Sequence, residues 1–198
     1  VASGSQKGYM IPPGLSFIAM SQKAWEASEK SNLPKFYLDL KSYRKSLKSN
    51  SNPYTPAVNL VFALDESLKM MREEGLENIF FRHDKHKLAI SNAVKALNLK
   101  LFADENYLSP SITAIKTEEI DAEEFRKAIK NKFDILLAGG QDHLKGKIFR
   151  VGHLGYVNDR DVITVISAIS KELLDLRKIT AQQAGEALLE ASKYLEES

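Results

Sequence analysis

The chain has 198 residues, of which 43% are apolar and 27% are charged, and its formal net charge is +2. That size can bury a core in one or two domains, and the small net charge provides no basic field of the kind that binds nucleic acid. The absence of cysteine excludes disulfide bonds and thiolate metal sites, and no apolar run approaches the roughly 20 residues that cross a bilayer.

Residues 1–20 hold the first stretch that can support chemistry. Lys7 lies among small and polar residues, before a Pro12-Pro13-Gly14 turn and an apolar strand that we expect over residues 15–20. This arrangement would hold the amine near the end of a sheet, beside backbone N–H groups that can bind an anion. An amine kept partly away from water can react with a carbonyl. The alternative is an ordinary turn lysine in solvent.

Two helices and an ordered loop should follow. Ser21 can cap a helix that begins at Gln22, and a second helix is expected around residues 41–46. Residues 49–56 contain two prolines and several Asn and Ser residues, which exclude a helix and predict an exposed loop. The residues alone favour a simple connector here.

A long helical pattern comes next. Apolar residues between positions 58 and 71 recur at helical spacings, which predicts a helix with a broad apolar stripe. Gly75 suits a helix C-terminus. A second helix is predicted over residues 76–97, and its buried positions should include Ile79, Phe80, Leu88, Ala89, Val94 and Leu97. We place a domain boundary after residue 98.

The remaining residues predict a mixed α and β domain. Strands are expected at residues 99–103, 112–116, 135–140 and 146–155, and helices should begin after Asp121, Asn158 and Thr180, whose side chains can cap them. His83 and His86 lie three residues apart on a predicted helix, but no third ligand is evident, so we expect no metal site. Residues 196–198 should fray.

The strand at residues 146–155 is the second stretch that can support chemistry. Alternation places Ile148, Arg150 and Gly152 on one face, whereas His153 lies on the other. We interpret His153 as a packing residue or as one that supports the site residues from behind. An arginine among apolar neighbours requires an anionic partner. Its planar guanidinium binds a carboxylate through two parallel hydrogen bonds. That carboxylate can be an acidic side chain of the fold or a ligand.

Two motifs resemble one known family. Ser3-Gly4-Ser5-Gln6-Lys7 followed by Pro12-Pro13-Gly14 is similar to the cofactor-lysine segment of class V pyridoxal-phosphate aminotransferases. The similarity is greatest to the alanine–glyoxylate, serine–pyruvate and serine–glyoxylate group, which has the fold type I architecture, and it runs through nearly the whole chain. It implies an α/β fold class: the end of the large domain over residues 1–98, and an α+β C-terminal small domain over residues 99–198.

The resemblance also implies roles for four residues. Lys7 matches the catalytic lysine that binds pyridoxal 5'-phosphate as a Schiff base, and Gln6 matches a residue that contacts the cofactor phosphate. Thr55 matches a threonine whose loop crosses to the other subunit of a homodimer and contacts the partner's cofactor phosphate. Asn52 stands where some relatives carry an aromatic residue in that loop. Arg150 matches the arginine that grips the α-carboxylate of the substrate.

These roles imply an activity for the intact protein. We expect a cytoplasmic aminotransferase that moves an amino group between a small amino acid, alanine or serine, and a 2-oxo acid such as glyoxylate or pyruvate. The resemblance covers the C-terminal half of the family's chains, without the strands that carry the rest of the cofactor site. We therefore expect the 198-residue chain alone to be inactive.

Two other interpretations stay open. The first is a different class V pyridoxal-phosphate enzyme, lyase-like or of the kind labelled a soluble hydrogenase small subunit. A cysteine desulfurase is disfavoured because the chain has no cysteine. The second is an inert dimerisation or interaction module.

Overall fold

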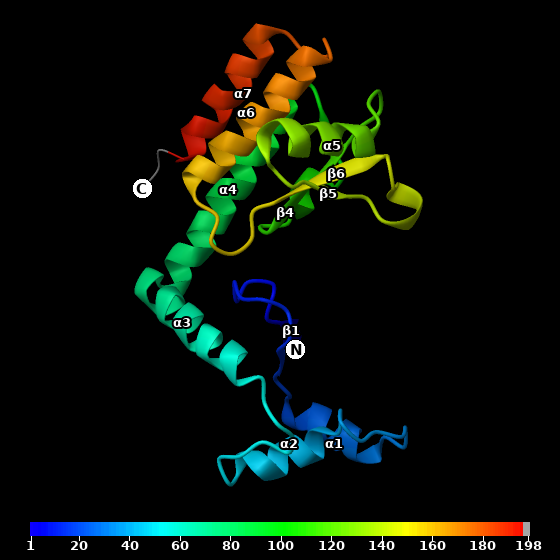
Figure 1. The fold of residues 1–198 in the computed structure, drawn as a ribbon, viewed down its shortest axis with the longest axis vertical. Helices are drawn as coiled ribbons and strands as arrows, with labels where there is room; N and C mark the ends of the chain where they lie inside the picture. Colours follow the sequence, from blue (N-terminus) through cyan, green and yellow to red (C-terminus); the bar gives the residue numbers. More distant parts are fainter. Residues whose placement is uncertain (196–198) are drawn as a thin grey trace. The chain divides into compact units, whose positions relative to one another are not determined.

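A computed structural model describes residues 1–195 of the chain, so the predicted fraying of residues 196–198 lies outside the described residues. The chain divides into two compact units, Val1–Glu73 and Glu74–Ser198. Figure 1 shows the first unit in blue to cyan and the second in green to red. No helix of residues 1–195 is long and apolar enough to cross a membrane.

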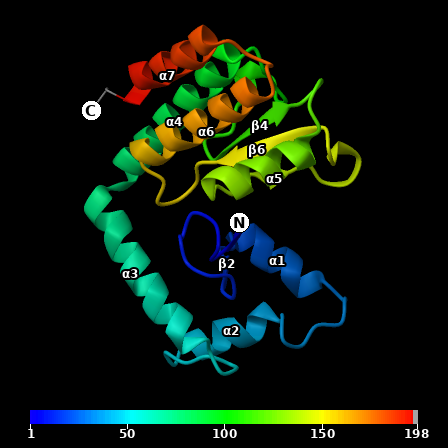
Figure 2. The ribbon, with the colours of Figure 1, turned by 45° about the horizontal axis from the view of Figure 1, so that its top comes forward.

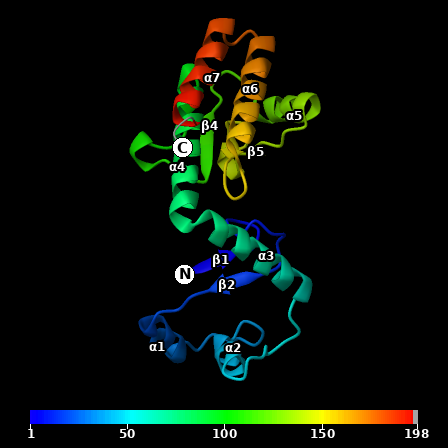
Figure 3. The same cartoon turned by 90° about the vertical axis from the view of Figure 1, so that its left-hand side faces the viewer.

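The first unit contains a short sheet and three helices. Strand β1 (Ala2–Gly4) pairs antiparallel with β2 (Ser16–Ile18), as Figure 3 shows. The helices are α1 (Gln22–Lys30), α2 (Leu40–Leu47) and α3 (Val58–Glu74). Ser21 caps α1 as predicted, because its hydroxyl accepts a hydrogen bond from Ala24 N at 3.2 Å. Residues 49–57 form the predicted loop.

The apolar stripe predicted over residues 58–71 lies on helix α3, and its members are exposed or partly buried within this unit. Ser67 is the one residue of α3 that is buried, whereas Val58, Val61 and Phe62 are exposed, the last by 73%. Periodicity predicted this helix correctly.

The second unit is built on a four-stranded antiparallel sheet. Its strand order is β3-β4-β6-β5, with β3 at Lys100–Leu101, β4 at Ile112–Lys116, β5 at Ala138–Gly139 and β6 at Ile148–Gly152. All four strands were predicted, although β3, β5 and β6 are shorter than expected. In the register, Arg150 of β6 lies between Ala114 of β4 and Ala138 of β5.

Helices cover one face of this sheet (Figure 2). They are α4 (Leu76–Ala96), α5 (Ala122–Phe133), α6 (Asp159–Asp175) and α7 (Ala181–Leu195), and the connections include the short 3₁₀ helices Glu105–Tyr107 and Asp142–Leu144. The ring of Phe149 on β6 stacks on Phe125 of α5 at 5.1 Å between centroids, and both side chains are buried. The opposite sheet face, which carries Arg150, is only partly buried within this unit.

Helix α4 packs within the second unit, against α6 and α7. Its residues Ala89, Val94 and Leu97 are buried as expected, whereas Phe80 is 59% exposed. The domain boundary that we place after residue 98 concerns the domains of the intact fold, and it stays a prediction.

Candidate functional site

The segment that carries Lys7 is a closed loop after strand β1. Ser5, whose side chain is completely buried, donates a hydrogen bond to Pro12 O at 2.7 Å and accepts one from Leu15 N at 3.1 Å. Ser5 N also donates to Leu15 O at 3.0 Å. One small hydroxyl therefore holds both ends of the loop, which a larger or apolar residue cannot do.

Lys7 lies in the turn of this loop. Its backbone N–H donates to Gly4 O at 3.3 Å, and its carbonyl accepts from Met10 N at 3.0 Å. The side chain of Gln6 lies close over Gly4, where a Cβ would stand 2.7 Å from its Oε1. The side chains of Gln6 and Lys7 are exposed within the first unit, and Lys7 forms no ion pair with any carboxylate of residues 1–195.

Helix α3 supports the far side of the same loop. Ser67, which is buried, donates its hydroxyl proton to Tyr9 O at 2.6 Å, and the ring of Tyr9 lies 4.3 Å from that of Phe17 on β2. The loop is therefore fixed by contacts at two points, Ser5 and Tyr9, and the amine of Lys7 projects from a held backbone.

Thr55 lies in the connector between α2 and α3 and is exposed. Its neighbour Tyr54 anchors the connector: its ring lies 4.8 Å from Tyr37 and 5.9 Å from Phe36, and its hydroxyl donates to Phe36 O at 3.3 Å. The aromatic contacts order the backbone beside Thr55 while leaving its hydroxyl accessible.

Arg150 lies on the open face of the sheet in the second unit. Its Nε donates to Gly139 O at 2.9 Å, and no carboxylate within the described residues pairs with its guanidinium. A bond through Nε leaves the two terminal nitrogens, which form the end-on fork that binds a carboxylate. The neighbouring residues in the register, Ala114 and Ala138, are small and leave room above the sheet.

An anchor that sequence reasoning missed holds the segment after Arg150. Arg82 on α4 donates Nη1 to Gly155 O and to Val157 O, both at 2.8 Å, and bonds Glu74 through Nε and Nη2 at 2.5 and 3.0 Å. Hydrogen bonds from Arg82 lower the pKa of the Glu74 carboxyl. No local pattern could have indicated this anchor, because Arg82 and Gly155 lie 73 residues apart.

The two histidines considered as weak metal candidates have structural partners. Nδ1 of His83 lies 2.7 Å from Ile79 O, and Gly155 N donates to Nε2 of His83 at 3.1 Å, which together require a neutral ring protonated on Nδ1. Nε2 of His86 lies 2.8 Å from Oδ1 of Asp159, and burial lowers the pKa of His86. Within residues 1–195 no group of three or more His, Asp or Glu side chains could hold a metal ion.

His153 is completely buried at the end of β6, in agreement with its interpretation as a packing residue. Its Nε2 lies 3.0 Å from the hydroxyl of Thr113 on β4. Burial lowers the pKa of His153 to about 4, so the ring is neutral near pH 7.

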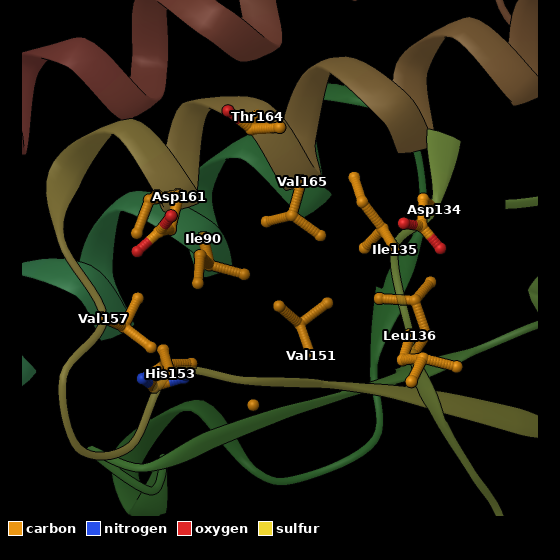
Figure 4. A pocket seen from close by; sticks show the side chains of 13 residues that line it. Ile90, Asp134, Ile135, Leu136, Val151, His153, Val157, Asp161, Thr164 and Val165 are labelled. Atoms are coloured by element: carbon orange, nitrogen blue, oxygen red, sulfur yellow. The ribbon is translucent and has the colours of Figure 1, made fainter. Parts of the chain in front are cut away.

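A cavity of about 310 Å³ lies on the helix-covered side of the sheet. Figure 4 shows Val151 of β6 and Val165 of α6 facing each other across it, with His153 and Asp161 at one end and Asp134 at the other. None of the predicted site residues lines this cavity.

The predicted site residues fall into both units. Gln6, Lys7 and Thr55 belong to Val1–Glu73, and Arg150 belongs to Glu74–Ser198. Lys7 and Arg150 form hydrogen bonds within their own units. The catalytic and binding roles assigned to all four residues stay predictions.

Some curated relatives are named soluble hydrogenase subunits and others are named aminotransferases. No protein-family model matches the chain. A soluble hydrogenase 42 kDa subunit of Anabaena cylindrica is 57% identical over 176 residues, which is 89% of this chain and 46% of that protein. A serine–glyoxylate aminotransferase of Methylorubrum extorquens is 35% identical over 204 residues, covering 99% of this chain and 50% of that protein. The chain thus spans about half the length of the curated relatives it matches.

A solved structure extends the similarity to the fold. The ureidoglycine–glyoxylate aminotransferase of Bacillus subtilis matches with a TM-score of 0.87 and 29% identity, covering 97% of this chain and 51% of that one. The match includes nearly every helix and strand described above, and it confirms the predicted mixed α and β fold class.

Proposed function

The chain belongs to the class V aminotransferases, of fold type I, and from this premise we propose that the intact protein is a pyridoxal-phosphate-dependent aminotransferase. The observation that carries the proposal is the Lys7 loop, in which a lysine that pairs with no carboxylate of residues 1–195 projects from a backbone held by Ser5 and Ser67. A lysine serving only solubility needs no such support.

The residues present fit the cofactor by their chemistry. The primary amine of Lys7 can bond the aldehyde, and the amide of Gln6 and the hydroxyl of Thr55 can donate hydrogen bonds to a phosphate. All three side chains are exposed in the first unit. When bound, pyridoxal 5'-phosphate supplies an electron sink for negative charge at the substrate's α-carbon.

Lys7 and Arg150 would have different roles in the reaction. Lys7 would hold the cofactor covalently and, once released by the incoming amino acid, would act as the general base that takes the proton from the α-carbon. Arg150 would bind the α-carboxylate through its terminal nitrogens and so orient the α C–H bond. Its bond to Gly139 O supports this role, because it points the fork in one direction.

The proposed substrates are a small amino acid, alanine or serine, and a 2-oxo acid such as glyoxylate. Support comes from the glyoxylate named in both the Methylorubrum and the Bacillus relatives. The proposal includes a cytoplasmic homodimer in which the loop ending at Thr55 reaches the partner's cofactor phosphate. The exposed position of Thr55, beside the anchored Tyr54, is compatible with that contact.

Replacement of Lys7 tests the proposal. In the intact protein, Lys7→Ala should remove the visible absorption of the lysine-bound cofactor and reduce transamination by several orders of magnitude. Borohydride reduction of the wild type should attach the cofactor mass to the peptide that contains Lys7. Lys23→Ala, an exposed lysine on α1, serves as the matched control and should change neither readout. Normal absorption together with full activity in Lys7→Ala would refute the assignment.

A second candidate follows from the name of the most similar relative described above. The Anabaena protein, at 57% identity, is called a soluble hydrogenase subunit. The intact protein could then act as part of a hydrogen-converting assembly. A panel of amino donors and 2-oxo acceptors, run beside a hydrogen-uptake assay on the same preparation, separates the two. Transamination without hydrogen uptake supports the aminotransferase, and the reverse supports the assembly.

A further inference from the structure

A hydrogen bond to strand β5 orients the side chain of Arg150, but β5 itself forms few hydrogen bonds with the rest of the sheet. The carbonyl that accepts from Arg150 Nε belongs to Gly139, in the two-residue edge strand β5. Among the strands of residues 1–195, β5 pairs with β6 alone, through two residue pairs. So short an edge strand has little ladder of its own to fix the position of its carbonyls.

A pair of charged side chains on α5 supplies the missing support. Arg126 donates Nε to Leu137 O at 2.7 Å, two residues before Gly139. Its Nη1 donates to both carboxylate oxygens of Glu123, at 2.9 and 2.8 Å. The carboxylate therefore holds the guanidinium of Arg126 in place, and that guanidinium holds the backbone of residues 137–139.

The lack of a side chain at Gly139 leaves room for the side chains of Arg126 and Glu123. A Cβ at position 139 would lie 2.5 Å from Nη1 of Arg126 and 2.7 Å from Oε1 of Glu123. Contacts that short force something to move, and the ends of two flexible side chains move more easily than the backbone. A methyl group at this position would therefore displace the pair from the strand.

We propose that Arg126, paired with Glu123 and packed on Gly139, is a positioning residue that holds the carbonyl orienting Arg150. The inference rests on the proposed function, because it assigns to Arg150 the substrate's carboxylate. Without a fixed acceptor for Nε, the guanidinium samples several rotamers, and binding the carboxylate must then order it. Arg126 touches neither substrate nor cofactor in this account.

The experiment is a set of double-mutant cycles in the intact enzyme. Arg126→Ala and Gly139→Ala should each lower kcat/KM for the amino acid about tenfold, the scale of one misplaced hydrogen bond to a charged group. The visible absorption of the bound cofactor should stay unchanged. Lys127→Ala, exposed on the same helix, and Gly185→Ala, where a Cβ meets nothing within 4 Å, are matched controls and should leave kcat/KM unchanged.

The cycles distinguish positioning from a general structural role. In an Arg150→Lys background, which lacks the guanidinium Nε, neither Arg126→Ala nor Gly139→Ala should reduce kcat/KM further by more than about twofold. Gly139→Ala should likewise lower kcat/KM little further when it is combined with Arg126→Ala, because the guanidinium that the new methyl group would contact is then absent. Losses of equal size with and without Arg150 would overturn the inference and show a merely structural effect.

The inference and the proposed function fail in different ways. If Arg150→Lys lowers kcat/KM while Arg126→Ala and Gly139→Ala do not, the positioning role is wrong and the function stands. If Arg150→Lys itself has no effect, Arg150 does not bind the carboxylate and both assignments fall. A thermal melt of each variant shows whether it is folded.

Discussion

Single buried polar side chains hold the two segments that carry the predicted site residues. Ser5 closes the loop of Lys7, and the hydrogen bond between Thr113 and His153 joins β4 to the end of β6, three residues after Arg150. A buried polar group without a hydrogen bond lowers the free energy of unfolding by about 1–3 kcal/mol. The hydrogen bonds of Ser5 and Thr113 avoid this cost. At this scale the site depends on residues that perform no chemistry.

The neutral state of His153 predicts a pH dependence of stability. Its pKa in the folded chain is about 4, below the ordinary 6.5, because burial opposes protonation. The unfolded chain therefore binds a proton that the folded chain does not, as pH falls from 6.5 towards 4. This contribution is fully present above pH 6.5, and on the order of 3 kcal/mol of unfolding free energy is lost across that range.

Urea unfolding at a series of pH values from 7.5 to about 4.5 measures this effect. His153→Gln should flatten the decline of the unfolding free energy, because its side chain does not titrate. His143→Gln, at an exposed histidine, is the matched control and should keep the wild-type slope. An unchanged slope in His153→Gln would show that other groups cause the acid sensitivity.

The helices begin where local capping groups place them, and the start of α6 matters most for the site. Asn158 accepts from Arg160 N at 2.9 Å and from Asp161 N at 3.2 Å, while Asp161 Oδ2 accepts from Asn158 N at 3.0 Å. This capping box comes directly after the segment that Arg82 anchors at Gly155 and Val157. The two features together fix the connection between strand β6 and helix α6.

Removal of this cap should destabilise the second unit by a predictable amount. Asn158→Ala leaves two N–H groups without their side-chain acceptor and should lower the free energy of unfolding by about 1 kcal/mol. Asn131→Ala, on the exposed side of α5, is the matched control and should be neutral or slightly stabilising, since alanine favours helices. Equal unfolding midpoints for Asn158→Ala and the wild type would contradict the capping role.

For the whole molecule, the proposed activity divides between the two units. Cofactor attachment is assigned to Lys7 in the first, and carboxylate recognition to Arg150 in the second. Changes in the two units should therefore have separable effects on the intact enzyme.

Arg150→Lys tests this division. Lysine keeps the charge but loses the bidentate fork, so kcat/KM for amino acids should fall roughly 10- to 100-fold. The visible absorption of the bound cofactor should persist, in contrast to Lys7→Ala. Arg160→Lys, at an exposed arginine on α6, is the matched control. An unchanged kcat/KM in Arg150→Lys would rule out the carboxylate role, and loss of the cofactor would contradict the division between the units.

The sequence by itself determined the features that depend on neighbours along the chain. Ser21, Asp121, Asn158 and Thr180 indicated where helices begin, because a cap bonds N–H groups two or three residues away. The positions of Lys7 and Arg150 within their motifs were likewise readable, and resemblance supplied roles for them. Mixed α and β structure followed from the spacing of apolar residues.

Only the tertiary structure decided what contacts those residues. Phe80 on α4 was predicted to be buried and is 59% exposed within its unit, because periodicity specifies a face of a helix but not the layer that covers it. The bonds from Arg82 to Gly155 and from His86 to Asp159 join residues more than 70 positions apart. The support of Arg150 through Gly139 and Arg126 is equally invisible in the sequence, since a carbonyl acceptor is present at every residue and only folding selects one.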